Sequence, residues 1–168
     1  GTLEVTGFAA GDTLSGSDGG DTENIDFVTF TFDGAEDYDG DGPVTINDFL
    51  VGGSASRDQL DLNDVLDVTG GVDVNPGPNS ELEESILLFQ GSVGATNDAS
   101  AVEATFGALT DLAADTASNL LVTRDDNFET VVWEWDDTNT GDIESGELTE
   151  VARLDDLGET LTADNFIV

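Results

Sequence analysis

The sequence contains no cysteine, histidine, lysine or methionine, and its 168 residues include only three basic side chains, Arg57, Arg124 and Arg153. Without cysteine and histidine the chain cannot form a disulfide, a Ser-His-Asp triad, a cysteine nucleophile, an ordinary zinc site or a haem ligand. Without lysine it can form neither a Schiff base nor a P-loop. Carboxylate pairs remain, but they are too numerous to single out a catalytic one. We therefore expect that the chain is not an enzyme.

Positive charge is nearly absent, and 38 acidic side chains give a formal net charge of −35. A chain this negative repels phosphate backbones and anionic membrane surfaces, so we expect no nucleic-acid binding. No apolar run approaches the ~20 residues of a membrane-spanning helix, so we expect no membrane insertion. The chemistry that remains is that of oxygen ligands. Hard cations such as Ca²⁺ take about six to eight of them.

Strand patterns dominate the chain. Alternation with period two, or apolar runs of strand length, occur between segments rich in Gly, Asp, Ser and Thr. The segments predicted as strands are 2–8, 25–32, 85–93, 119–125, 129–135, 147–154 and 165–168. Segment 58–68 fits a strand or a short helix, and 44–51 follows an Asp-Gly loop without an element assigned to it. Segments 11–24 and 69–81 are predicted as loops. The last four strands are expected to form a β-meander, in which Val131, Trp133 and Trp135 share a core face.

One segment has a helical pattern. From residue 97 onward, apolar side chains recur at spacings of three and four at Val102, Phe106, Leu109 and Ala113. Asn97 or Asp98 can cap this helix, and its first turn is expected to be acidic. We predict a single, mainly β domain over 1–168, a β-sandwich or β-roll-like meander with one or two short helices. A subdivision into 1–96 and 97–168 remains open.

The first candidate calcium site is loop 1, residues 37–48, with the sequence DYDGDGPVTIND. It matches the EF-hand loop of about 12 residues position by position. The residues at ligand positions 1, 3, 5, 7, 9 and 12 are Asp37, Asp39, Asp41, Pro43, Thr45 and Asp48. Gly42 at position 6 allows the sharp turn, Pro43 offers its carbonyl, and Val44 at position 8 is the apolar anchor. Because Asp48 is shorter than the usual Glu, we expect a looser or monodentate last ligand.

The second candidate is loop 2, residues 136–147, with the sequence DDTNTGDIESGE. The residues at its ligand positions are Asp136, Thr138, Thr140, Asp142, Glu144 and Glu147. Gly141 at position 6 and Ile143 at position 8 agree with the pattern. A hydroxyl is a weaker calcium ligand than a carboxylate, and Asp137, Asn139 or Asp142 are alternatives to the threonines.

Other interpretations of these loops stay open at this point. Either loop can be an acidic hairpin turn without a metal. Because strand patterns precede both loops, we expect EF-hand-like calcium loops on a β scaffold instead of true helix-loop-helix EF-hands. Residues 16–24 weakly match the calcium-binding nonapeptide of β-rolls. That match is one degenerate copy, so an ordinary turn is favoured, although Asp12, Asp18 and Asp21 offer a further site.

Two stretches resemble a known family. Residues 44–66, VTINDFLVGGSASRDQLDLNDVL, resemble the D-x-I-x-D-F-x-x-G-x-D-x-L-D-L-S-D-L-L element near the C-terminus of RTX-type calcium-binding proteins exported by bacterial type I secretion. The tail from Leu120 to Val168 is similar to the C-terminal meander of S-layer and other large surface proteins of that group. The resemblance covers roughly the last 125 residues with a gap at the helix. It implies an extracellular or cell-surface location, calcium-dependent folding and a C-terminal export signal.

These observations lead us to expect a calcium-binding structural module that associates with itself or with neighbouring domains of a surface protein. One alternative is an accessory or secretion module of an exported enzyme. A dockerin-like binding module is another, but its two loops lie close together, whereas here residues 37 and 136 are 99 positions apart. The acidic composition also has an explanation that involves no specific function, namely adaptation to high salt. It predicts acids on all faces, whereas here many lie in glycine-containing loops.

Overall fold

The structure of the chain is a computed structural model that describes residues 2–16, 27–34, 37–38, 42–51, 57–65, 71–75, 85–106, 119–136, 143–155 and 157–167. Its elements in chain order are β1 (Thr2–Val5), β2 (Thr13–Ser15), β3 (Phe27–Thr31), β4 (Val44–Asn47), β5 (Gln59–Asp61), β6 (Gly71–Val74), β7 (Ser85–Ser92), α1 (Ala99–Phe106), β8 (Asn119–Arg124), β9 (Thr130–Trp135), η2 (Ser145–Glu147), β10 (Leu148–Leu154), η3 (Ala163–Asn165) and β11 (Phe166–Ile167). The prediction of a mainly β fold with a short helix is confirmed.

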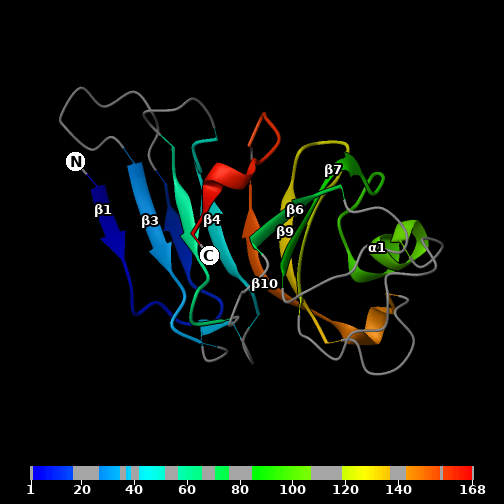
Figure 1. The fold of residues 1–168 in the computed structure, drawn as a ribbon, viewed down its shortest axis with the longest axis horizontal. Coiled ribbons are helices and arrows are strands. Elements are labelled where there is room, and N and C mark those ends of the chain that lie inside the picture. The colour runs from blue at the N-terminus through cyan, green and yellow to red at the C-terminus, as the bar shows by residue number, and fades with distance from the viewer. Residues whose placement is uncertain are drawn as a thin grey trace.

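The strands form two sheets. Sheet A has four strands in the order β1-β3-β5-β11, and sheet B has seven in the order β2-β4-β10-β9-β8-β7-β6. Along the first third of the chain, successive strands alternate between the sheets, and each pairs in parallel with the strand two before it, as in the registers Thr2↔Phe27 and Thr13↔Thr45. The chain therefore coils in the manner of a β-roll. Figure 1 shows β1 and the N-terminus at one end of the molecule and α1 at the other.

The last third forms an antiparallel meander of β8, β9 and β10 within sheet B, as predicted. The expectation that residues 165–168 extend this meander is wrong, because β11 pairs in parallel with β5 in sheet A. Phe166 is buried there in the core between the sheets, and the amide of Leu62 donates to the carbonyl of Ile167 at 3.2 Å. Sheet B combines β2, β4, β6 and β7 with β8 to β10, so strands from both sides of position 96 share one sheet.

Each face of sheet B covers its own hydrophobic core. The core between the two sheets includes Phe30, Ile46 and Leu60, all fully buried. The core on the opposite face, under α1, contains Val131, Trp133 and Trp135, which confirms their predicted common face. Phe106 of α1 packs there on Phe89 with ring centroids 4.0 Å apart. The fold is thus three layers, with sheet B in the middle.

The helix begins where its pattern predicts. The Asp98 carboxylate accepts a hydrogen bond from the Ala101 amide at 2.9 Å, so Asp98 is the cap. The expectation of an acidic first turn is wrong, since α1 has no acidic residue there. Val102 and Phe106 are buried as predicted, and Leu109 and Ala113 lie outside the described residues. None of the helices in the described part of the chain has the length and apolar character needed to cross a bilayer.

The Asp98 cap leads to a pH-dependent prediction. The backbone of Ala101 and the hydroxyl of Thr96 donate hydrogen bonds that lower the pKa of Asp98 below its ordinary value. Because the folded-state pKa is the lower one, the cap stabilises the fold above the ordinary pKa of about 3.9, and this contribution is lost as the pH falls through the folded-state pKa.

We expect Asp98→Ala to lower the urea midpoint at pH 7 and the difference from the unchanged chain to shrink below about pH 4. Asp98→Asn retains an acceptor for the cap and should stay close to the unchanged chain at pH 7. A difference between Asp98→Ala and the unchanged chain that is constant from pH 7 to pH 3 would contradict the assignment.

Candidate functional site

The two acidic loops lead into neighbouring strands of sheet B. Loop 1 leads into β4 and loop 2 into β10, and these two strands pair in parallel with Val44 opposite Ala152. Neighbouring parallel strands begin at the same side of a sheet. The strands that follow the two loops therefore lie side by side and run in the same direction, with the first residue of β4 level with the fifth residue of β10, although the loops start 99 positions apart at residues 37 and 136.

The start of loop 1 is buried. Asp37 is 4% exposed, and its Oδ2 accepts a hydrogen bond from the Asp33 amide at 2.7 Å. Gly42 has a φ of 110°, a left-handed backbone that glycine adopts freely, as its predicted role at position 6 requires. Val44 is fully buried in the core between the sheets. The buried side chain at position 8 and the left-handed backbone at position 6 thus agree with the loop pattern.

The end of loop 1 departs from an EF-hand. Positions 8 to 11 form the extended strand β4, which lengthens by about 3.3 Å per residue, so Asp48 lies at the far end of β4 from Pro43. The residues after Asp48 contact the start of β3, because Asp58 accepts hydrogen bonds from both Leu50 and Val28. Asp37, by contrast, follows the end of β3. The structure does not bring Asp48 to the start of the loop, because a strand replaces the helical turn that would return it.

Thr45 and Pro43 are half-buried on either side of the Val44 anchor. Thr45 is in β4, opposite Arg153 of β10 on one side and Thr13 of β2 on the other. Side chains alternate along a strand, so Thr45 lies on the opposite face of sheet B from Val44. Pro43 directly precedes β4, so its carbonyl belongs to the part of loop 1 that comes before the strand.

Loop 2 is closed at its ends. The Asp136 amide donates to the Glu147 carbonyl at 3.0 Å, which joins positions 1 and 12. The Glu147 carboxylate accepts hydrogen bonds from Trp135 Nε1 at 3.2 Å and from the Glu144 amide at 3.4 Å. Ile143 is 1% exposed in the core under α1, as an anchor at position 8 should be. The side chains of Asp136 and Glu144 are exposed.

Five predicted ligands lie outside the described residues: Asp39, Asp41, Thr138, Thr140 and Asp142. The same holds for Asp18 and Asp21, and Asp12 caps its own turn by accepting from the Ala9 amide at 2.9 Å. Within the described residues alone, no group of three or more acidic side chains is placed to hold a metal ion.

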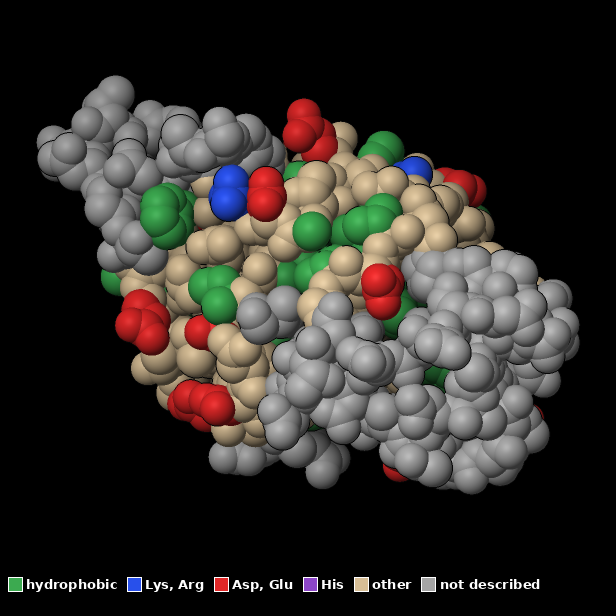
Figure 2. Space-filling view, in the orientation of Figure 1, with side chains coloured by type: hydrophobic (Ala, Val, Ile, Leu, Met, Phe, Trp, Pro, Cys, Tyr) green, Lys and Arg blue, Asp and Glu red, His purple; other side chains and the backbone are tan. Residues whose placement is uncertain are grey.

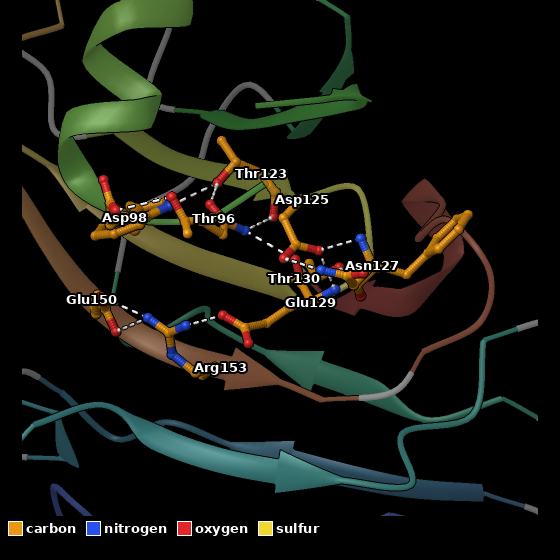
Figure 3. Close-up of polar contacts among 12 residues, drawn as sticks. Thr96, Asp98, Thr123, Asp125, Asn127, Glu129, Thr130, Glu150 and Arg153 are labelled. Atoms are coloured by element: carbon orange, nitrogen blue, oxygen red, sulfur yellow. Dashed lines mark hydrogen bonds and ion pairs between the residues drawn. The ribbon is translucent and has the colours of Figure 1, made fainter. Parts of the chain in front are cut away.

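A polar cleft lies near the Thr130 end of β9, the end away from loop 2, and was not predicted from the sequence. It has a volume of about 360 Å³, and its lining includes Asp98, Asp125, Glu129 and Arg153. Figure 3 shows Arg153 between Glu150 and Glu129, with ion pairs to both. Partial burial lowers the pKa of Arg153, but hydrogen bonds and charge attraction from Glu150 and Glu129 outweigh it and raise the pKa overall.

The cleft is built from satisfied polar groups. Asp125 is 4% exposed and accepts hydrogen bonds from the amides of Asn127 at 2.7 Å and Glu129 at 2.9 Å, which shapes the β8–β9 turn. Beneath it, buried Asn97 donates to the carbonyls of Thr123 and Glu129. The run DDNFE at 125–129 is a turn signal, but nothing local relates it to Arg153. These contacts account for the cleft as a structural element that joins α1 to the meander.

Comparison of the chain with protein-family models, with curated proteins and with solved structures gave no match.

Proposed function

We propose that this chain is an extracellular calcium-binding structural module of a secreted bacterial surface or matrix protein, and that it folds and assembles when calcium is present. The observation that supports the proposal is that the two ligand-spaced acidic segments precede neighbouring parallel strands of sheet B, β4 and β10. Each loop has its apolar anchor, Val44 or Ile143, buried in one of the two cores. The secreted and surface-bound character follows from the family resemblance.

The charge balance supports a role for cations. All three arginines are engaged within the chain: Arg57 with Asp164, Arg124 over the ring of Phe128, and Arg153 with two glutamates. The remaining carboxylates of a chain at −35 therefore lack basic side chains to neutralise them. Calcium that binds only the folded chain converts binding free energy into folding free energy.

Assembly is proposed from the sheet edges. Among the described strands, β1 pairs only with β3 and β2 only with β4. The first coil of the chain, β1 and β2, therefore forms one edge of each sheet. Edge strands are often protected by lysine, which this chain lacks. Self-repulsion opposes association of two chains until bound calcium reduces it. The partner is thus another copy of the chain or a neighbouring domain of the same surface protein.

The test is the number of calcium ions bound. We expect Asp39→Asn combined with Asp41→Asn to remove one bound ion in calorimetric titration, because too few oxygens remain to replace the water around the ion. Asp37 stays unchanged in this variant because its carboxylate also holds the Asp33 amide. A second variant, Glu4→Gln with Asp73→Asn, removes the same number of charges from exposed strand positions and should bind as many ions as the unchanged chain. Equal stoichiometry in all three proteins would refute the loop 1 site.

A further inference from the structure

The core between the two sheets has an uncovered end at the first coil. Leu3 of β1 is paired with Val28 of β3. Paired residues on neighbouring strands share a face of the sheet, and Val28 lies in the core between the sheets, where it is 3% exposed. Leu3 therefore points toward the end of the same core, but it is 46% exposed.

Two further side chains complete this uncovered end. Val5 on β1 and Leu14 on β2 are partly buried and pack against the same core, one from each sheet. Leu14 is paired with Ile46 of β4, which is fully buried. We call Leu3, Val5 and Leu14 the end layer. Within the described part of the chain, no strand lies beyond β1 and β2 to cover this layer.

The backbone at the first coil also has an unpaired side. Each of its two strands has one neighbour among the described strands, so the other edge of each strand presents N–H and C=O groups to a further strand. Figure 1 shows β1 at the outer end of the ribbon. At the other end of the core, η3 contacts both β5 of sheet A and β6 of sheet B, so a segment of the chain spans the two sheets there. The first coil is thus the end at which both sheets can be extended together.

We propose that this end is an interface between two copies of the chain, related by a two-fold axis perpendicular to the sheets. In this dimer β1 pairs antiparallel with β1 of the second copy, β2 pairs with its β2, and the two end layers cover each other. The inference rests on the assembly part of the proposed function. A partner that extends both sheets at once must present two strand edges at the separation of β1 and β2. An identical first coil meets this requirement, because a two-fold axis sets the same surface against itself.

The proposed interface is small and brings like charges together. The strands contribute four residues from β1 and three from β2 in each copy, against about 20–30 residues a side in a standard interface. We therefore expect a weak dimer, with a dissociation constant of about 10 µM. Glu4 is exposed on β1 and repels its counterpart across the antiparallel pair, so salt and bound cations should strengthen the dimer.

The first experiment measures dimer formation by sedimentation equilibrium of the full chain, at millimolar calcium and again with a chelator at high NaCl. Leu3→Asp places a charge in the end layer and should weaken the dimer by about tenfold or more. Thr13→Asp changes an exposed position on β2 and should weaken it about threefold, because like charges then face each other across the β2 pair. Glu4→Gln removes a repulsion and should strengthen it about threefold.

Val74→Asp is the matched control for these variants. Val74 is 45% exposed and lies on β6, the edge strand at the other end of sheet B. The substitution makes the same chemical change at an equally exposed apolar side chain outside the proposed interface. We expect the dissociation constant of the dimer to change less than about twofold.

Chemical cross-linking tests the symmetry of the dimer, because the chain has no cysteine. Glu4→Cys introduces a single thiol on β1, and the two-fold axis brings the two copies of this thiol within reach of a short bis-maleimide. Asp73→Cys places a thiol at an exposed position of β6 and should cross-link far less. Thr13→Asp and the cross-link keep the test independent of how well Leu3→Asp folds.

The outcomes separate this interface from other modes of assembly. Weaker dimers in Leu3→Asp and Thr13→Asp but not in Val74→Asp, together with the cross-link through residue 4, support the inference. A dimer that responds to neither substitution places the interface elsewhere and overturns it. A chain that binds calcium but stays monomeric overturns it too, while the calcium-binding part of the proposed function stands. If the dimer forms as described and no calcium binds, the interface stands and the calcium-binding part fails.

Discussion

Removing calcium is expected to lower the thermal midpoint of the domain by about 20 °C. A site held at a thousandfold excess of calcium over its dissociation constant stabilises the folded state by about 4 kcal/mol, so two sites contribute about 8 kcal/mol. For a chain of this length, each kcal/mol corresponds to about 2–4 °C. The repulsion among the carboxylates of a chain at −35 adds to the loss when the ions leave.

The measurement is thermal unfolding followed by far-UV circular dichroism, with millimolar calcium or with a chelator, at constant ionic strength. A parallel series varies NaCl at fixed calcium and distinguishes calcium binding from adaptation to high salt. General screening acts on every surface charge, whereas calcium acts at its sites. If chelation leaves the midpoint unchanged and low NaCl unfolds the chain, the high-salt explanation is the correct one.

The charge distribution is compatible with both calcium binding at the loops and general screening of surface charges by salt. Figure 2 shows acidic side chains at several separate places on one face of the described surface, so the acids are not confined to the two loops. Exposed acids such as Glu4 on β1 and Asp73 on β6 lie on strands outside both loops. Dispersed charges of this kind respond to ionic strength, which is why the two salts must be varied independently.

Local patterns in the sequence predicted most strands and the helix cap. Residues 25–32 carry apolar groups on both faces, which predicts a strand covered on both sides. In β3 Phe30 is fully buried and its neighbour Thr29 is only 8% exposed. The strands β2 and β6 were missed within segments predicted as loops. They have only three and four residues, and each pairs in parallel with a later strand, β4 or β7, beyond an intervening segment of the chain. Such short strands depend on pairing, which no local pattern reveals.

Pairing also decided what could be predicted of the site. The left-handed backbone at Gly42 and the burial of Val44 and Ile143 agree with the loop pattern, because these features depend on a few adjacent residues. The loop pattern did not predict that β4 begins at position 8, because that follows from parallel pairing with β10. The strand then carries Asp48 away from the loop. The hydrogen bond from the Tyr38 hydroxyl to Glu134 was likewise beyond prediction, since it joins positions 96 apart that only the assembled sheets bring together.

The second large effect is expected at Asp58, a fully buried carboxylate next to the first coil. Its Oδ1 accepts from the Val28 amide at 2.8 Å and its Oδ2 from the Leu50 amide at 2.9 Å. Its carbonyl accepts from Asn165 Nδ2 at 3.0 Å. A side chain on Gly16 would collide with the same carboxylate, so the backbone closes tightly around it. The Asp58 carboxylate thus joins β3 to the segment after β4, and the backbone carbonyl of the same residue holds the C-terminal segment.

We expect Asp58→Ala to destabilise the domain by about 3–5 kcal/mol, or about 10–15 °C in thermal midpoint, because each of the two amides loses its partner at about 1–3 kcal/mol. Asp58→Asn should cost nearly as much, since its amide group has one acceptor oxygen and would place N–H groups against the other donor. Asp61→Asn, three residues along on β5, is the control. Among the described residues its carboxylate bonds to Asn63 alone, and we expect a change within about 0.5 kcal/mol. Denaturant unfolding at saturating calcium measures all three variants, and an Asp58→Asn midpoint equal to that of Asp61→Asn would show that this carboxylate does not hold the coil together.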